Sequence, residues 1–336
     1  MVIIVDGMGG DFAPREIVQG ALLAREAYGL EIGLVGDETA LREYLPQGTS
    51  GITIFHAPEV IGMDEHPVRA VRKKVNSSLV QGLRLVKEGT GSGFVSAGNT
   101  GATMAGALFN LGRLPGVSRP AISSLFPTEK GMCIIVDAGA NVDCRPEHLQ
   151  QFAVMGAIYS QTVLGRKEPG IALLNNGEEE TKGCALTLAA HRLLGETPGI
   201  NYLGFIEARD ITAGRADVIV CDGFVGNILL KLAEGLGETL FKMLKEESRK
   251  NFRQQLGALL LAPGLRNLKK SVDYTEYGGA PLLGINGVCI IAHGSSNAKA
   301  IQNAIRVCAQ AVEGNIVGQI GSRIEKLGGE GNGGSE

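Results

Sequence analysis

The chain alternates short runs of β-branched residues with longer segments of helical periodicity. Residues 2–5 precede a helical pattern at 15–28, and residues 32–35 precede a helix that Asp37 or Thr39 could cap. Further short apolar runs, nearly all followed by a small-residue or polar loop, lie at 52–55, 93–96, 122–126, 133–136, 171–174, 218–221 and 288–292. This βαβ rhythm predicts a mainly parallel sheet with helices on both faces.

One segment departs from this rhythm. Residues 227–270 contain two successive helical stretches with no strand between them, so we expect them to project from the sheet. Residues 328–336 are Gly-rich and polar, and we expect a flexible tail there because they bury too little apolar surface to offset the entropy of ordering. Residues 1–327 are expected to form a single α/β unit that includes the projecting segment.

Composition excludes several classes of partner. The formal net charge of −3 and the absence of a Lys/Arg-rich run argue against a nucleic-acid partner. The six cysteines include no CxxC pair and no nearby His at zinc-ligand spacing, so we expect reduced thiols and no metal site. The N-terminus lacks the features of a signal peptide, and no apolar run approaches the roughly 20 residues of a membrane-spanning helix. We therefore expect a cytoplasmic protein.

Candidate ligand-binding loops follow the predicted strands. Ligands of open parallel sheets bind at the carboxyl ends of the strands, so we expect these loops to gather at one rim of the sheet. The first loop contains Gly9, Gly10 and Asp11, where glycine lets the backbone approach a ligand and the next helix start offers amides to an anion. A tight structural turn is the alternative, and the GxGxxG spacing of a dinucleotide site is absent.

Two later loops repeat this design. Ser96, Asn99 and Thr100 stand between a predicted strand and a Gly/Ala-rich helix, where hydroxyl and amide groups could hold a phosphate. Simple capping of that helix by Asn99 or Thr100 is the alternative. Asp137 and Asn141 follow another strand, where Asp137 could orient a donor or could be a buried, hydrogen-bonded loop residue.

The remaining loops supply charged and amide groups. Lys182 follows three acidic residues, and if a helix begins near Glu178 it lies one turn in and leans back toward the strand ends; a solvated ion pair is the alternative. Asp222 follows a strand, and Asn227 is either a helix N-cap or a substrate hydrogen-bonding group. His293 is the best acid–base candidate of the five histidines, although a helix-capping His is more often structural.

Familiar catalytic motifs are missing from the chain. There is no Gly-x-Ser-x-Gly elbow, no Walker loop and no HExxH helix. Many anion-friendly turns with few nucleophiles suit a reaction in which the substrate brings its own nucleophile, and phosphate is the natural one.

Taken in order, these blocks resemble the phosphate acyltransferase (PlsX) family. The resemblance covers almost the whole chain and is specific as an ordered series, although each block alone is a weak signal. The matching blocks are residues 6–14, 63–67, 72–74, 77–78, 96–102, 137–144, 177–183, 222–227 and 294–296. Gly7 departs from the Ala usual in the family, but Gly9 and Gly10 are kept.

The resemblance implies a three-layer α/β/α sandwich related to isopropylmalate dehydrogenase and phosphate acetyltransferases, a homodimer and no cofactor. It implies transfer of a fatty acyl group from acyl–acyl carrier protein to inorganic phosphate, giving acyl phosphate for phospholipid (phosphatidic acid) synthesis. A downstream acyl-phosphate:glycerol-3-phosphate acyltransferase would consume this product. Carried over by motif, Lys182 and Asn227 are the expected catalytic residues.

Phosphate is already nucleophilic at neutral pH, so such an enzyme need only position it and stabilise the oxyanion. We expect Lys182 to hold phosphate or the developing charge, and Asn227 with nearby amides to donate to the carbonyl oxygen. No acyl-cysteine is required, and His293 could assist the departing thiolate.

Two surfaces are candidates for macromolecular contacts. Arg72, Lys73 and Lys74 could dock an acidic carrier protein or could form a solvated helix face. Leu259, Leu260 and Leu261 precede Pro263 and Gly264, which read as a turn near basic residues, and the resemblance implies peripheral contact with the inner face of the membrane. A helix buried in a dimer interface is the competing interpretation.

Three other functions remain open. A coenzyme A-dependent phosphate acetyl- or butyryltransferase would share fold and chemistry but need a nucleotide pocket. A decarboxylating dehydrogenase would need grouped carboxylates for a metal and a nicotinamide site. A noncatalytic membrane-recruited scaffold would bind carrier protein and release no acyl phosphate.

Overall fold

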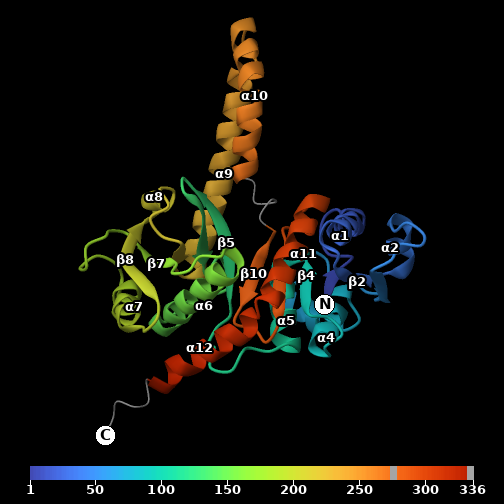
Figure 1. The fold of residues 1–336 in the computed structure, drawn as a ribbon, viewed down its shortest axis with the longest axis horizontal. Coiled ribbons are helices and arrows are strands. Elements are labelled where there is room, and N and C mark those ends of the chain that lie inside the picture. Colours follow the sequence, from blue (N-terminus) through green and yellow to red (C-terminus); the bar gives the residue numbers. More distant parts are fainter. Residues whose placement is uncertain (273–277, 331–336) are drawn as a thin grey trace.

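The computed structural model describes residues 1–272 and 278–330, with side chains described for 1–265 and 278–328. Eleven strands form one sheet in the order β3-β2-β1-β4-β11-β10-β5-β6-β9-β7-β8 (Figure 1). The strands are β1 (Val2–Asp6), β2 (Glu31–Gly36), β3 (Ile52–His56), β4 (Gly93–Ser96), β5 (Ala121–Thr128), β6 (Gly131–Val136), β7 (Gly170–Asn175), β8 (Asn201–Glu207), β9 (Val218–Val220), β10 (Ala280–Leu283) and β11 (Val288–Ile291).

Strand direction divides the sheet into two parallel groups. In one group β1 pairs with β2 and β4, β2 with β3, and β4 with β11. In the other, β9 pairs with β6 and β7, and β7 with β8. Between the groups β10 runs antiparallel to β11 and β5, and β5 runs antiparallel to β6. Because of these three reversals the strands of the two groups run in opposite directions. Their carboxyl ends therefore point to opposite ends of the strands.

Helices cover both faces of this sheet. Ile3 and Val5 of β1 join the hydrophobic cluster of α1, α6, α11 and α12, whereas Ile4 joins the cluster of α3, α4 and α5. Because successive side chains of a strand point to opposite faces, these clusters are the two sides of a three-layer sandwich, as predicted. The helices of these layers are α1 (Arg15–Tyr28), α2 (Glu38–Tyr44), α3 (Pro67–Lys73), α4 (Ser78–Lys87), α5 (Thr100–Asn110), α6 (Pro146–Leu164), α7 (Ala185–Glu196), α8 (Ala208–Ile211), α11 (Ala298–Glu313) and α12 (Ile316–Glu330).

The two successive helices expected around residues 227–270 form a hairpin that rises from the sheet (Figure 1). α9 spans Gly223–Glu247 and α10 spans Phe252–Val272. The expected turn at Pro263 is wrong, because Pro263 lies inside α10. The chain instead reverses at residues 248–251, where Asn251 Oδ1 accepts the N–H of Gln254 at 3.0 Å and starts the second helix.

Asp37 caps α2, with its Oδ1 accepting the N–H of Ala40 at 2.8 Å, so the first of the two expected caps is confirmed. α12 continues to Glu330, so the first residues of the expected tail at 328–336 are helical. Residues 331–336 lie outside the described chain.

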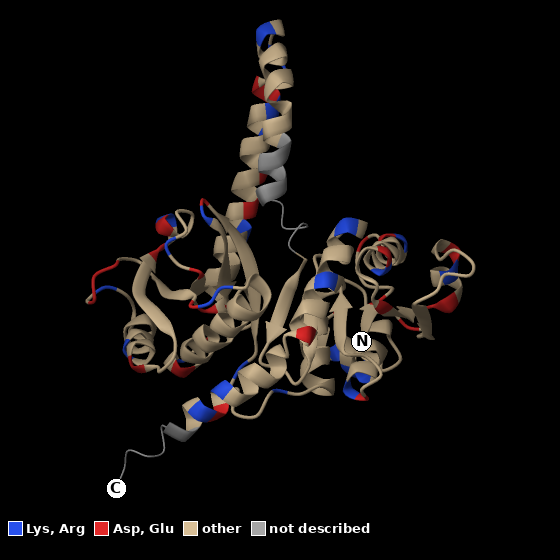
Figure 2. Cartoon of the chain, viewed as in Figure 1, with Lys and Arg blue, Asp and Glu red and all other residues tan. Residues whose placement is uncertain are grey.

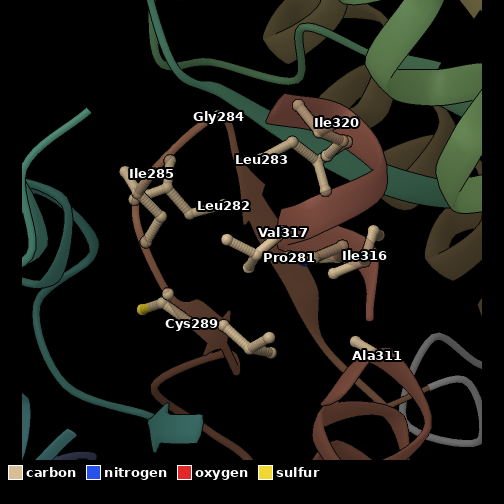
Figure 3. A pocket seen from close by; sticks show the side chains of 12 residues that line it. Pro281, Leu282, Leu283, Gly284, Ile285, Cys289, Ala311, Ile316, Val317 and Ile320 are labelled. Atoms are coloured by element: carbon tan, nitrogen blue, oxygen red, sulfur yellow. The ribbon is translucent and has the colours of Figure 1, made fainter. Parts of the chain in front are cut away.

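A small apolar space separates the β10–β11 hairpin from α11 and α12. Leu283 of β10 and Ile316 and Ile320 of α12 are among the residues that line it (Figure 3). Its cavity volume of about 10 Å³ is close to the minimum for one water, and its lining carries no polar side chain. It is therefore a packing feature of the core rather than a ligand site.

Candidate active site

Three loops meet at the edge where β6, β9 and β7 end, which we call the second rim: residues 137–141, 222–227 and 175–182. The strand order β6-β9-β7 places these loops side by side. Lys182 and Asn227, the two expected catalytic residues, thus come from neighbouring strands at one edge. Arg215 also reaches this edge and forms an ion pair with Glu178.

Asp137 organises the second rim from within. Its Oδ1 accepts N–H groups of Ile122, Gly139 and Ala140 at 3.0–3.1 Å, and its Oδ2 accepts the main-chain and side-chain N–H groups of Asn141 at 2.7 and 2.8 Å. Burial raises the pKa of Asp137, and the donors partly offset this rise. Every acceptor position is thus occupied, so Asp137 is the buried loop aspartate of the alternative interpretation.

Asn141 is partly committed to the same network. Its Nδ2 also donates to the carbonyl of Pro120 at 2.7 Å, and its own carbonyl accepts the N–H of Gly223 at 2.7 Å. Asn141 therefore joins the Asp137 loop to the start of α9. Only its Oδ1 is left for a ligand among the hydrogen bonds of the described chain.

Asn227 lies within α9, so it is not the N-cap. Asp222 has that role, since its Oδ1 accepts the N–H of Val225 at 2.9 Å. Asn227 is half-buried, and within the described residues its side-chain amide makes no hydrogen bond. A Cβ placed on Gly139 would lie 3.5 Å from Asn227, which shows how closely the Asp137 loop approaches this side chain. The amide of Asn227 is thus available to a ligand.

Lys182 is exposed and lies in a turn rather than one turn into a helix, because α7 begins only at Ala185. The turn is held by the Lys182 N–H, which donates to the Glu179 carbonyl at 2.9 Å, and by Asn175 Nδ2, which donates to the Lys182 carbonyl at 3.1 Å. Among the ion pairs of the described side chains Lys182 has none, so the solvated-pair alternative is not what the structure contains. Its ammonium is available to an anion.

The other parallel group ends at what we call the first rim: residues 9–11, 96–100 and 293–296. Ser96 Oγ donates to Asp6 Oδ2 at 2.8 Å and accepts the N–H of Gly98 at 3.1 Å. Burial raises the pKa of Asp6, against the hydrogen bonds from Ser78 and Ser96. A Cβ on Gly9 would lie 2.5 Å from Asp6 Oδ2, so only glycine fits there. Ser96 is therefore an internal tie of this rim.

Asn99 is also occupied. Its Oδ1 caps α5 by accepting the N–H of Ala102 at 2.9 Å, and its Nδ2 donates to the carbonyls of Met63 and Glu65 at 2.8 and 3.2 Å. The capping alternative is therefore what the structure contains for Asn99. Thr100 follows as the first residue of α5 and is exposed.

The third loop of the first rim closes against the first. The N–H of Asp11 donates to the carbonyl of Gly294 at 2.8 Å, and Gly10 adopts a φ of +115° that favours glycine. His293 is exposed, and its Nδ1 lies 2.7 Å from Ser295 Oγ. It caps no helix, because Asn297 is the N-cap of α11.

The expectation of one rim is wrong, because non-local antiparallel pairing inverts half of the sheet. The register at β10 limits the separation: Ile122, beside Asp137, pairs with Leu282, and Ile291 of the first rim pairs with Ala280. Ile122 and Ile291 are thus two residues apart along β10, about 7 Å, and two strand spacings apart, about 10 Å, and Asp137 lies one strand further, at the end of β6.

Apolar contacts link the two rims on one face. Ala138 and Leu230, from the second rim and the next turn of α9, pack in the hydrophobic cluster that contains Ala102 and Ala105 of α5. The two helix starts therefore approach a common cluster, although their strands end at opposite edges.

Two further observations bound the chemistry. Within the described residues no group of three His, Cys, Asp or Glu side chains could hold a metal ion. A groove of about 350 Å³ lies between α6 and α12, lined by residues that include Ile158, Gln319 and Arg323. It contains none of the rim residues, so it is separate from the loops of the candidate site.

The hairpin exposes an apolar stripe. Leu232, Leu236 and Leu240 of α9 recur every fourth residue and are more than half exposed. Leu259, Leu260 and Leu261 of α10 are 70%, 74% and 64% exposed. Charged side chains lie at the turn of the hairpin and at intervals along α9 (Figure 2), whereas residues 254–265 of α10 carry none. Within the described chain no helix is long and apolar enough to span a membrane.

Comparison with known proteins gives three findings. A family model described as fatty acid synthesis protein matches residues 1–319. Phosphate acyltransferases of Pelotomaculum thermopropionicum and Desulforamulus reducens are 55% and 52% identical to this chain, covering 100% and 96% of it and 98% and 97% of the relatives. A phosphotransacetylase structure from Streptococcus pyogenes has a TM-score of 0.66 at 22% identity, covering 93% of this chain and 94% of that one, which shows a shared fold.

Proposed function

Because the chain belongs to the phosphate acyltransferase family, we propose that it transfers a fatty acyl group from acyl–acyl carrier protein to inorganic phosphate. The product would be an acyl phosphate for phospholipid synthesis, consumed by a downstream acyl-phosphate:glycerol-3-phosphate acyltransferase. One observation carries the assignment of the reacting site: Lys182 and Asn227 lie on neighbouring loops of the second rim, and neither polar side-chain group is engaged by another side chain of the described chain.

The chemistry at this rim is an addition followed by elimination. A phosphate oxygen attacks the thioester carbonyl carbon, and the carbonyl oxygen gains negative charge. Asn227 Nδ2 donates to that oxygen together with the N–H of Phe224, the one first-turn amide of α9 with no acceptor among the described residues, while the Lys182 ammonium balances the charge of the phosphate. Collapse of the tetrahedral intermediate breaks the carbon–sulfur bond and releases the carrier thiolate, which gains a proton from solvent.

The rim residues whose polar groups are already hydrogen-bonded support this geometry indirectly. Asp137 and Asn141 hold the loop that faces Asn227, and Asp222 starts the helix that carries it. Rigid supports of this kind keep a donor in place without rearrangement during the reaction.

The decisive assay mixes the purified chain with acyl–acyl carrier protein and phosphate and traps acyl phosphate with hydroxylamine. We expect acyl hydroxamate that depends on both substrates, and faster turnover of acyl–carrier protein than of acyl–coenzyme A. Turnover of acyl–coenzyme A alone would assign the coenzyme A-dependent reaction instead. Binding of carrier protein without any acyl hydroxamate would leave only a scaffold role.

The proposed carrier-docking surface is smaller than the basic run in the sequence. Lys74 is committed to Glu65, with 2.5 Å between Nζ and Oε1. Arg72 stacks over the Phe109 ring at 5.1 Å and stays exposed beside Lys73. Complementary charge raises encounter rates, so Arg72 and Lys73 are the residues we propose to meet an acidic carrier.

Charge reversal tests this surface. Lys73→Glu should raise the KM for acyl–carrier protein about tenfold and leave the KM for acyl–coenzyme A unchanged, because the coenzyme lacks the protein surface. Lys87→Glu, an exposed change on α4, is the control. An equal effect of Lys73→Glu on both donors would contradict the docking role.

We further propose a homodimer and peripheral membrane contact through the hairpin. The exposed leucines Leu259, Leu260 and Leu261 support an apolar contact of α10. They lie well away from the turn at residues 248–251, so contact with a bilayer would use the side of the helix rather than its tip.

A further inference from the structure

The space between α6 and α12, which we call the helix groove, lies apart from both rims. These two helices pack side by side (Figure 1), and the groove between them has a volume of about 350 Å³. Each helix lines it with residues at i, i+3, i+4 and i+7, which is the spacing of one helix face. The α12 residues are Gln319, Ser322, Arg323 and Lys326, and the α6 residues repeat this spacing from Val154 to Gln161. The volume falls in the range of small-molecule sites.

The floor of the helix groove is apolar. Val154, Ala157 and Ile158 of α6 are buried, and Ile200, from the loop before β8, adds a fourth apolar side chain. All four belong to the hydrophobic cluster of α6 or pack against it. A ligand on this floor must present apolar surface, because a polar group there would lose its hydrogen bonds to water.

The α12 side of the helix groove is cationic. Lys326 is exposed, and within the described residues its ammonium forms no ion pair or hydrogen bond. Arg323 donates from Nη2 to the carbonyl of Pro198, and its remaining N–H groups have no acceptor in the same part of the chain. A Cβ on Gly199 would collide with the guanidinium of Arg323, so this loop holds the guanidinium in place.

The charge of the helix groove is of one sign. The described residues that line it include two cations and no acidic side chain, although the whole chain has a formal net charge of −3. The two glutamines of the lining are already used: Gln161 Nε2 donates to the carbonyl of Lys167 at 3.2 Å, and Gln319 Nε2 donates to the carbonyl of Gly314 at 2.6 Å. The cations therefore remain as the charged donors for a ligand, and they complement an anion.

We propose that the helix groove binds a long-chain amphiphile with a single anionic head group. The chain lies on the α6 floor, and the head group meets Arg323 and Lys326. A carboxylate or a phosphate fits there, because a guanidinium donates two parallel N–H groups to either one. A fatty acid and an acyl phosphate share this chemistry.

The helix groove is a second site rather than part of the reacting one. α6 begins at Pro146, close to the Asp137 loop, and Val154 lies about 12 Å further along the helix. The groove can therefore bind such a ligand whether or not the second rim catalyses the proposed reaction.

Calorimetric titration of the full chain tests the binding. The probes are decanoate, decylphosphonate and decanol, each below the concentration at which it aggregates. We expect saturable binding of an anionic probe at one site, and at least about tenfold weaker binding of decanol, because decanol lacks the charge that Arg323 and Lys326 complement. Tighter binding of decylphosphonate than of decanoate would indicate acyl phosphate as the ligand, and the reverse order would indicate a fatty acid.

Two variants locate the binding. Lys326→Glu should weaken binding of both anionic probes about tenfold, because repulsion replaces attraction at the head group. Ser322→Phe should weaken it as well, since the ring fills the groove without changing the charge. Both positions are exposed, and circular dichroism checks that the variants fold. Lys87→Glu on α4 makes the same charge change elsewhere and should keep the wild-type affinity, as should Leu260→Glu on the hairpin.

Hydrogen exchange shows where the chain of the amphiphile lies. A saturating anionic probe should slow exchange at residues 154–161 and 316–326. Slowing confined to the hairpin, residues 223–265, would place the chain on the exposed leucines and overturn the proposal. Binding of decanol as tight as that of both anions would also overturn it. So would the absence of saturable binding of either anion, or an unchanged affinity in both the Lys326→Glu and the Ser322→Phe proteins.

Discussion

Polar side chains of the two rims differ in whether the fold already uses them. Asp137, Ser96 and Asn99 are hydrogen-bonded to main-chain and side-chain partners, whereas the Asn227 amide and the Lys182 ammonium have no partner within the part of the chain that the structure describes. A group that must meet a substrate cannot also satisfy the protein, so this difference separates supports from candidates for chemistry. Residue type alone could not reveal it, because capping and ligand binding use the same side chains.

Removing the ammonium should affect the reaction and little else. Lys182→Ala should lower kcat/KM about 10²-fold, because the charge on phosphate and carbonyl oxygen loses its counter-charge. Asn227→Ala should act similarly through the lost donor. Lys87→Ala, an exposed lysine of α4, should keep wild-type kinetics in the hydroxamate assay. Full activity of the Lys182→Ala protein would remove this residue from the site.

Asp137 should matter for stability instead. Asp137→Ala leaves the amides of Gly139, Ala140 and Asn141 without their acceptor, so the free energy of unfolding should fall by about 3 kcal/mol. Urea denaturation measures this, with the exposed Asp143→Ala as control. A fall no larger than that of the control would contradict the supporting role.

Cys184 is the thiol closest in sequence to Lys182, and it is exposed. A hydrogen bond from the main chain of Thr187 lowers its pKa, whereas burial raises the pKa of the half-buried Cys144 to about 12. A lower pKa means more thiolate at pH 7.5, so iodoacetamide should label Cys184 at least about tenfold faster than any other cysteine. Peptide mapping checks this, and first labelling of Cys144 would contradict it.

At the scale of elements, the sequence predicts those helices and strands whose formation depends on nearby residues. The runs that became β1 and β2, and the helix capped by Asp37, follow from periodicity and capping. β10 was missed because Pro281 lacks an N–H and argues against a strand. The turn expected at Pro263 and Gly264 is wrong because Pro263 lies inside α10, and the Asn251 cap that starts this helix was not identified from the sequence. In both cases a proline, which usually marks the end of a helix or strand, lies inside one.

The hairpin gives a prediction at this scale. Leu260→Glu should abolish flotation with anionic vesicles, since it places a charge among the exposed leucines Leu259, Leu260 and Leu261 of α10. Glu246→Gln, near the turn, should float like wild type. Equal flotation of the Leu260→Glu protein would exclude membrane contact through these leucines. A loss of the dimer in the same variant would assign the leucines to the subunit interface.

At the scale of the whole molecule, the layers could be predicted and the relation of the loops could not. Alternating strands and helices indicate a covered sheet, and nearly every loop of interest does end a strand. Which way each strand runs depends on pairings such as β10 with β5, between residues more than 150 positions apart. These pairings divide the one expected rim into two. Lys182 and Asn227 follow neighbouring strands, whereas Ser96 ends a strand that runs in the opposite direction.

The central claim is that phosphate, not a protein side chain, attacks the thioester. Intact-protein mass spectrometry during turnover of acyl–carrier protein and phosphate tests it most directly, with the Cys184→Ser variant assayed in parallel. The account predicts that the chain keeps its unmodified mass and that Cys184→Ser makes acyl phosphate at the wild-type rate. A chain heavier by one acyl group that forms and decays within the turnover time would contradict it.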